Sequence, residues 1–188
     1  GRNVIFQLGT GKFGCRDDKG DFSDEAFADI AAHDNVSMIE LKIMQGAKPG
    51  KGGILPKEKI TAEIAAIRKV PMGQDILSPP RHDEFDDLAG MFDFLDRLRK
   101  LADKPIGIKI VAGHIEEIES IAEAMAAEPG RGPDFISVDG GEGGTGAAPL
   151  EYANHVGTPL NDALIFVHNS LVGCNLRDKI RIISSGKI

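Results

Sequence analysis

Cysteine is scarce in this chain of 188 residues, and metal-binding motifs are lacking. The two cysteines, Cys15 and Cys174, form no CxxC pair, and the five histidines show no HExxH or other paired-ligand spacing. These absences argue against zinc hydrolysis and predict no metal site within the chain. Both cysteines are expected to be reduced residues of the core or of loops.

Long apolar runs and an excess of basic residues are also lacking. No stretch of about 18 apolar residues occurs and no signal peptide is recognisable, so the sequence predicts no membrane segment. A formal net charge of −7 argues against a nucleic-acid partner, which usually needs a basic face. The composition, 41% hydrophobic and 27% charged, is typical of one globular domain. We expect a cytoplasmic protein that acts on a small molecule.

Strand-like and helix-like patterns alternate along the chain. Five short apolar runs predict strands: Val4–Leu8, Ser37–Ile43, Ile106–Val111, Phe135–Val138 and Lys179–Ser184. Helical spacing between them predicts helices: Asp24 to about His33 with Ser23 as N-cap, Glu58–Lys69, Asp87–Lys100, Ile115–Met125 and Asn161–Val172. Strands that alternate with helices form parallel βαβ units, so the sequence predicts one α/β domain.

The connections after strands are long, polar and rich in glycine, whereas those after helices are short. Because ligands of parallel α/β folds bind at the carboxyl ends of the strands, we expect these loops to form one functional face. Five strands could complete an open doubly wound sheet, whereas a (β/α)8 barrel needs eight strands and about 250 residues. The pattern by itself slightly favours the open sheet.

The stretch VDGGEGGTGAAP, Val138 to Pro149, has five glycines in the seven positions from Gly140 to Gly146. It does not fit GxGxxG well and lacks the lysine of a phosphate P-loop. Glycine allows a flat ring or a substrate to approach the main chain, where N–H groups can point at an anion or a carbonyl oxygen. The alternative is a flexible surface turn.

Charged side chains stand within apolar strands. Glu40 and Lys42 are two positions apart and so share a face, and Lys109 repeats the pattern on the next strand. Since an unpaired buried charge is costly, they form either a structural salt bridge or a cluster of acid and base groups, with Glu40 and Lys109 brought towards one another. Such a lysine suits the negative N1–C2=O edge of a reduced flavin, a substrate carboxylate or a phosphate.

Two loops add candidates for the same face. His82 lies in the loop SPPRHD, which we expect to open towards that face, and it is either solvated or catalytic. The residues Ser184-Ser185-Gly186-Lys187 follow the last strand and could begin a phosphate site, because late strand ends in barrels often hold one.

Several motifs together resemble the FMN-binding barrel domain of glutamate synthase and its single-domain relatives. They cover essentially the whole chain in order: GTGKFGCRDDKGDFS, MIELKIMQGAKPGKGGILP, SPPRHDEF, VDGGEGGTGAAP and FVHNSLVG. The resemblance implies a TIM (β/α)8 barrel of the FMN-dependent oxidoreductase type, present over residues 1–188 as an incomplete barrel of about five βα units. It implies reduction of 2-iminoglutarate, formed from 2-oxoglutarate and ammonia, or of a related substrate, with electrons from FMN.

The resemblance also implies roles for individual residues. Lys109 matches the barrel lysine near flavin and substrate, and Glu40 matches a glutamate that assists proton transfer to the imine. The expected substrate-binding residues are Gln45, Gly46, Lys48 and His82. The expected FMN-binding residues are Gln7, Lys109, Asp139, Gly140, Gly141, Gly143, Gly144, Thr145, Ser185, Gly186 and Lys187. Family members usually also carry an iron–sulfur cluster, whose cysteines are not in this chain.

If the five runs are strands three to seven of that barrel, the first two and the eighth are absent. We therefore expect these 188 residues alone to be catalytically silent, because an open sheet cannot enclose the flavin. Two other functions stay open. One is hydroxy-acid oxidation in another FMN barrel, which calls for a histidine base, and the other is a non-catalytic module that binds flavin or a metabolite. The electron donor is not identified, and a homo-oligomer is possible.

Overall fold

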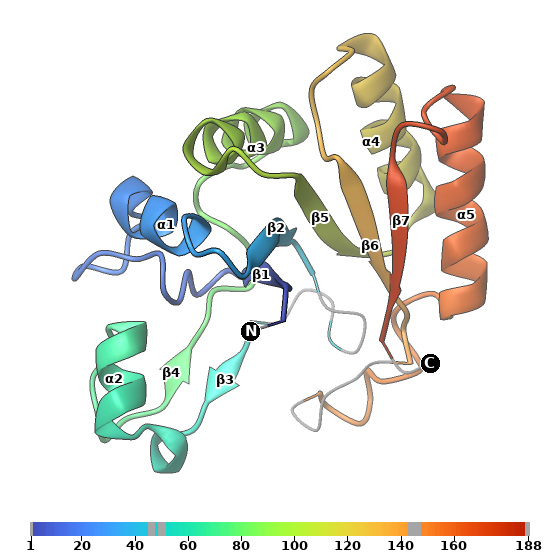
Figure 1. Cartoon of the computed structure of the whole chain (residues 1–188). Coiled ribbons are helices and arrows are strands. Elements are labelled where there is room, and N and C mark those ends of the chain that lie inside the picture. Colours follow the sequence, from blue (N-terminus) through green and yellow to red (C-terminus); the bar gives the residue numbers. More distant parts are fainter. Residues whose placement is uncertain (1, 45–47, 49–51, 143–147, 187–188) are drawn as a thin grey trace.

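The computed structural model describes residues 2–44, 48, 52–142 and 148–186 (Figure 1). Five strands form one sheet in sequence order: β1 (Val4–Leu8), β2 (Val36–Lys42), β5 (Ile106–Val111), β6 (Phe135–Asp139) and β7 (Arg181–Ser185). Every neighbouring pair in this sheet is parallel. All five predicted strands are confirmed, with ends that differ by at most two residues.

The helices lie between successive strands. They are α1 (Asp24–Ala31), α2 (Ala62–Arg68), α3 (Leu88–Ala102), α4 (Ile115–Ala127) and α5 (Leu160–Gly173). The side chains of Ser23, Thr61 and Asp87 accept backbone N–H bonds in the first turns of α1, α2 and α3, which satisfies donors that have no partner within the helix. The predicted cap at Ser23 is confirmed.

The helices α1, α3, α4 and α5 lie along the outer side of the curved sheet (Figure 1). A chain that advances one strand at a time through right-handed crossovers places each helix on the same face. A doubly wound sheet instead reverses its strand order and carries helices on both faces. The slight preference for an open doubly wound sheet, taken from the pattern alone, is therefore wrong.

The hydrophobic core fills the space between the sheet and these helices. Ile39 and Leu41 of β2 and Ile106 and Ile108 of β5 are fully buried and belong to one cluster with Phe92 of α3. Each buried side chain of this size stabilises the fold by about 1.5–3 kcal/mol. Because side chains alternate along a strand, the residues between them point to the opposite face of the sheet.

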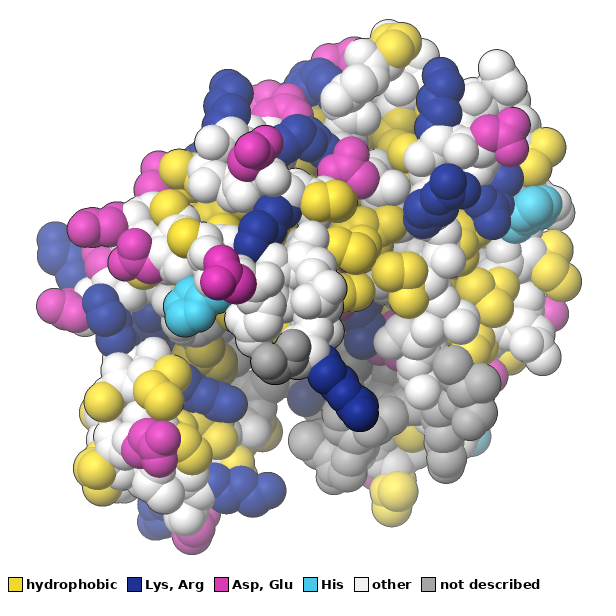
Figure 2. All heavy atoms as spheres, in the orientation of Figure 1, with side chains coloured by type: hydrophobic (Ala, Val, Ile, Leu, Met, Phe, Trp, Pro, Cys, Tyr) yellow, Lys and Arg dark blue, Asp and Glu magenta, His cyan; other side chains and the backbone are white. Residues whose placement is uncertain are grey.

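The connection from β2 to α3 forms a small unit of its own that projects from the sheet (Figure 1). It contains the antiparallel strands β3 (Ile54–Leu55) and β4 (Ile76–Leu77), the 3-10 turn η1 (Lys57–Lys59) and α2. Its strands were not predicted, and the helix predicted from Glu58 begins only at Ala62. Figure 2 shows apolar side chains on the surface of this unit, where Ile54, Ile67, Met72 and Leu77 are exposed.

Candidate functional site

The face of the sheet turned away from the helices carries the polar residues of the strands. In the strand register, Gln7 lies opposite Glu40, Lys42 opposite Lys109, and Lys109 opposite Ser137. Neighbours in register point to the same side of a sheet. Four strands therefore contribute polar side chains to one surface, towards the carboxyl ends of β1, β2, β5 and β6.

Glu40 and Lys109 share this face, as predicted, but each has its own partner. The Gln7 amide Nε2 donates to Glu40 Oε1 at 2.5 Å, and Lys109 Nζ lies 3.5 Å from Asp139 Oδ2. Glu40 pairs in register with Gly107, so it lies two residues further from the carboxyl edge of the sheet than Lys109. Both carboxylates are buried, which makes their partners important for stability.

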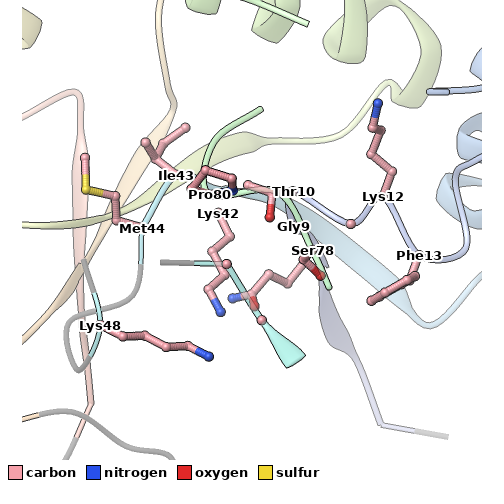
Figure 3. A pocket seen from close by; sticks show the side chains of 14 residues that line it. Gly9, Thr10, Lys12, Phe13, Lys42, Ile43, Met44, Lys48, Ser78 and Pro80 are labelled. Atoms are coloured by element: carbon pink, nitrogen blue, oxygen red, sulfur yellow. The ribbon is translucent and has the colours of Figure 1, made fainter. Parts of the chain in front are cut away.

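A cavity of about 230 Å³ opens at the carboxyl ends of β1 and β2. Its lining includes Gln7, Lys42, Met44, Lys48, Ser78 and Pro80. Figure 3 shows the side chains of Lys42 and Lys48 ending close together in this space, whereas Lys12 is turned away from it. Two positive charges thus face a cavity that also contains the polar end of β1.

The electrostatics of the cavity favour a bound anion. Burial lowers the pKa of the Lys42 ammonium, and the positive charges of Lys109 and Lys48 lower it further. The carboxylates of Asp139 and Glu40 oppose this shift. A carboxylate or phosphate bound between the lysines would relieve their repulsion and form charge-assisted hydrogen bonds.

The first two glycines of the glycine-rich stretch make room for the chain itself. Gly141 N–H donates to the Thr158 carbonyl at 2.8 Å, and Gly140 N–H donates to the Ser185 carbonyl at 3.3 Å. A side chain on Gly141 would collide with the backbone carbonyl of Gly157. These two N–H groups therefore bond main-chain carbonyls of the protein, and the FMN-binding role expected for Gly140 and Gly141 stays a prediction. Three further candidates lie outside the described residues: Gly143, Gly144 and Thr145.

The end of β7 lies beside the end of β6. Ser185 is opposite Asp139 in register, and Gly186 has a φ of +114°, which favours glycine. A Cβ on Gly186 would lie 2.9 Å from Asp139 Oδ1. The close approach explains this glycine. The candidates Gln45, Gly46 and Lys187 lie outside the described residues.

His82 is buried and turned towards β2, with 2% of its surface exposed. Its Nε2 lies 3.0 Å from the Lys42 carbonyl oxygen, and its ring stacks on Phe85 with centroids 5.5 Å apart. The ring does not line the cavity that contains the Lys42 and Lys48 side chains. The alternative of a solvated side chain is therefore wrong, while the loop itself reaches the cavity through Ser78 and Pro80. The substrate-binding role expected for His82 stays a prediction.

Sequence reasoning missed a buried ion cluster behind the cavity. Lys12 Nζ lies 2.6 Å from Asp83 Oδ1 and 2.9 Å from Glu84 Oε1. Burial opposes the ionised forms, yet hydrogen bonds to Asp83 and Glu84 raise the pKa of Lys12, and the nearby His82 ring together with the Lys12 ammonium lowers the pKa of Glu84 to about 2. These partners are 71 and 72 positions apart, so spacing gave no signal for them. The positive φ of Lys12, 52°, is likewise invisible in the sequence.

Metal ligands do not gather in the part of the chain that is described. No group of three or more His, Cys, Asp or Glu side chains there is placed to hold a metal ion. Cys15 is fully buried, which raises the pKa of its thiol to about 12, and Cys174 is partly exposed. Among the same residues, no helix is both long and apolar enough to cross a membrane.

Comparison with known proteins decides the family. The family described as "Conserved region in glutamate synthase" matches residues 1–188. The chain belongs to the glutamate synthase family. It is 43% identical over 188 residues to the glutamate synthase large subunit-like protein YerD of Bacillus subtilis (strain 168), covering 100% of this chain and 35% of that protein. The resemblance drawn from the motifs is thereby confirmed.

Two further relatives carry glutamate synthase in their names. The chain is 40% identical over 192 residues to the archaeal glutamate synthase (NADPH) of Methanocaldococcus jannaschii, covering 99% of this chain and 33% of that protein. It is 38% identical over 149 residues to the ferredoxin-dependent glutamate synthase of Antithamnion sp., covering 78% of this chain and 9% of that protein. The chain thus spans about a third of the length of the first two relatives and a smaller share of the third.

Proposed function

We propose that the 188 residues are one part of an FMN-binding (β/α)8 barrel in a longer glutamate synthase-type oxidoreductase. Helices on one face only and a polar opposite face favour a barrel wall, since a barrel packs its inward side chains in layers. A chain that covers about a third of its relatives fits a partial domain.

The proposed reaction is the reduction of 2-iminoglutarate, formed from 2-oxoglutarate and ammonia, to glutamate. The observation that carries it is the pair of lysines, Lys42 and Lys48, in one cavity at the carboxyl ends of the strands. Their ammonium groups would bind a substrate carboxylate and orient the substrate. Glu40, held by the Gln7 amide, would assist proton transfer to the imine nitrogen.

The flavin suits the open polar face better than the cavity. A cavity of about 230 Å³ is below the roughly 300 Å³ at which pockets for larger ligands begin, so it fits a small dicarboxylate. Gln7, Lys109, Asp139, Ser185 and Gly186 would hold the FMN. When bound, FMN supplies the electron pair for the reduction. Lys109 would stabilise the negative charge of the reduced ring by its fixed ammonium.

The test uses the full-length protein. It should release FMN on denaturation and form glutamate from 2-oxoglutarate and ammonia when chemically reduced. Lys109→Met and Lys42→Met should each lower kcat/KM at least roughly a hundredfold, because each removes a charge aimed at the reacting groups. The control Lys100→Met, on the exposed surface of α3, should retain full activity. A full-length protein without FMN, or one that forms no glutamate, would overturn the proposal.

One alternative is weakened by the geometry. Hydroxy-acid oxidation in an FMN barrel calls for a histidine base, but the Nε2 of His82 is held at the Lys42 carbonyl oxygen. A non-catalytic binding module would retain FMN yet show no turnover in the full-length protein. The cytoplasmic location and a homo-oligomeric state remain predictions, and the electron donor is not identified.

A further inference from the structure

Three buried side chains, Lys12, Glu84 and His82, form a series of contacts that ends at the backbone of β2. Lys12, in the β1–α1 connection, lies 2.9 Å from Glu84 Oε1, and Glu84 Oε2 lies 3.7 Å from His82 Nδ1. His82 Nε2 lies 3.0 Å from the carbonyl oxygen of Lys42, the last residue of β2. We call these residues, Lys12, Glu84 and His82, the buried relay.

The relay contains a mismatch if the histidine ring is neutral. The Lys42 carbonyl can only accept a hydrogen bond, so Nε2 must carry a proton and donate it. In a neutral ring, Nδ1 then presents a lone pair to the Glu84 carboxylate. His82 Nδ1 and Glu84 Oε2 are both buried without a hydrogen-bond partner. Such atoms are rare in native proteins, because an unpaired buried polar group is costly.

A second proton on the ring removes this mismatch. Nδ1–H then faces a carboxylate oxygen at ion-pair distance, and both ring nitrogens are donors with acceptors opposite them. Lys12 balances the carboxylate from its other side. The side chains of His82 and Glu84 are only 1% and 9% exposed, so water screens this attraction weakly.

The other charged groups around the ring have partners or lie at a distance. Asp83 binds Lys12, and Arg81 lies 3.4 Å from Asp86. From α4, Glu117 lines the same groove as His82 and adds a further negative charge on that side. Glu84, at ion-pair distance from Nδ1, is thus the charged side chain that acts on the ring most directly.

We propose that His82 is a positioning residue, a doubly protonated ring that ties the end of β2 to Glu84 and thereby holds Lys42 at the cavity. The side chain of Lys42 reaches into the cavity (Figure 3). The ring of His82 contacts the backbone carbonyl of the same residue. The use of Lys42 for a substrate carboxylate rests on the proposed function, but the positioning itself does not.

The protonation state is measured on the full-length protein labelled with 15N-histidine. The His82 signals, identified by their loss in His82→Gln, should show two protonated ring nitrogens at pH 7. A neutral ring with an unprotonated Nδ1 would overturn the proposal. Glu84→Gln should shift the ring towards the neutral form, because it removes the carboxylate that faces Nδ1.

Positioning is measured by the reactivity of Lys42 with an acylating reagent across pH, read by peptide mass spectrometry. In His82→Leu, Lys42 should relax into water and its labelling midpoint should move up towards that of exposed lysines. Each unit of upward shift lowers labelling at a fixed pH below the midpoint about tenfold, because only the neutral amine reacts. His82→Gln keeps one donor for the carbonyl and should shift the midpoint less.

Controls separate positioning from general loosening. Asp83→Asn keeps the ion pair between Lys12 and Glu84 and should not change the labelling of Lys42. The exposed Lys100 should react equally in all variants. If His82→Leu does not fold, Glu84→Gln tests the relay from its other end. An unchanged Lys42 midpoint in every variant would overturn the proposal. Labelling needs no substrate, so absent glutamate synthesis would contradict only the proposed function.

Discussion

At the scale of single residues, the buried charges gather at one edge of the molecule. Glu40, Asp139 and Lys48 lie at or just beyond the carboxyl ends of the strands, and Lys12 follows β1. At the amino edge, Arg99 and Arg131 bind carboxylates but keep more than a quarter of their side chains exposed. Buried charges are costly, so their concentration at one edge is better explained by function than by stability.

Glu84 provides a prediction for stability against pH. Burial opposes its charge, but the nearby His82 ring and the Lys12 ammonium lower its pKa from its ordinary value near 4.5 to about 2. Its ionised form therefore stabilises the folded state above about pH 4.5, and this contribution is lost as pH falls towards about 2. In the full-length protein, Glu84→Gln should lower the unfolding free energy at pH 7 by roughly 1–3 kcal/mol.

Urea unfolding at pH 7 and at pH 3 measures this dependence. The difference between wild type and Glu84→Gln should shrink at the lower pH, because the Glu84 carboxyl of the unfolded chain takes up a proton below about pH 4.5. Asp83→Asn is the matched control, since the Asp83 side chain is 60% exposed and its ion pair should contribute under about 1 kcal/mol. A loss in Glu84→Gln that is equal at both pH values would contradict the assignment.

At the scale of elements, β2 carries the core on one face and the candidate site on the other. Ile39 and Leu41 are fully buried against the helices, while Glu40 and Lys42 lie on the polar face. A shift of one residue in its register would exchange these two sets. The strand is paired on both sides, with β1 and β5, which opposes such a shift.

Gly107 of β5 is expected to be required by its neighbour on β6. A Cβ at this position would overlap the ring of Phe135, which is buried and lies opposite Gly107 in register. Gly107→Ala should therefore destabilise the full-length protein by about 1–3 kcal/mol, the usual cost of overpacking. Gly113→Ala is the control, because nothing lies within 4 Å of its added Cβ. Equal melting temperatures for the two variants would contradict this packing.

The elements that the sequence predicts well are those with a repeated pattern. β5 and α3 show clear apolar periods, because each presents one face to the core, and both formed close to the expected residues. The strands β3 and β4 have two residues each, which is too short for any period. They exist because the chain between β2 and α3 folds back on itself, a tertiary effect that no local pattern contains.

In the candidate site, too, the residues on regular strands were predictable and those in loops were not. Positions 40, 42 and 109 are fixed relative to one another by strand alternation and parallel register, so the polar face was predictable. The direction of His82 depends on a loop that crosses behind β2, and the pairing of Lys12 with Glu84 joins residues 72 positions apart. Loops are placed by contacts distant in sequence, so their side chains could not be oriented without the fold.

At the scale of the whole molecule, the described sheet has two edge strands, β1 and β7. Val4 and Ile5 of β1 are more than 40% exposed, and the polar face beside the cavity has no helix over it (Figure 1). Open edges with exposed apolar side chains tend to pair with other chains. The 188 residues expressed alone should therefore self-associate through these edges, which the remaining strands of a full-length barrel would cover.

The same geometry predicts how the isolated chain treats FMN. A flavin on the polar face would contact Lys109 and Asp139 from one side only, while ligand sites usually bury 70–90% of the ligand surface. Titration of the 188-residue chain with FMN, followed by flavin fluorescence, should show no saturable quenching, and the full-length protein should bind stoichiometrically. Stoichiometric binding by the isolated chain would mean that five strands suffice to build the site, and would contradict the partial-barrel proposal.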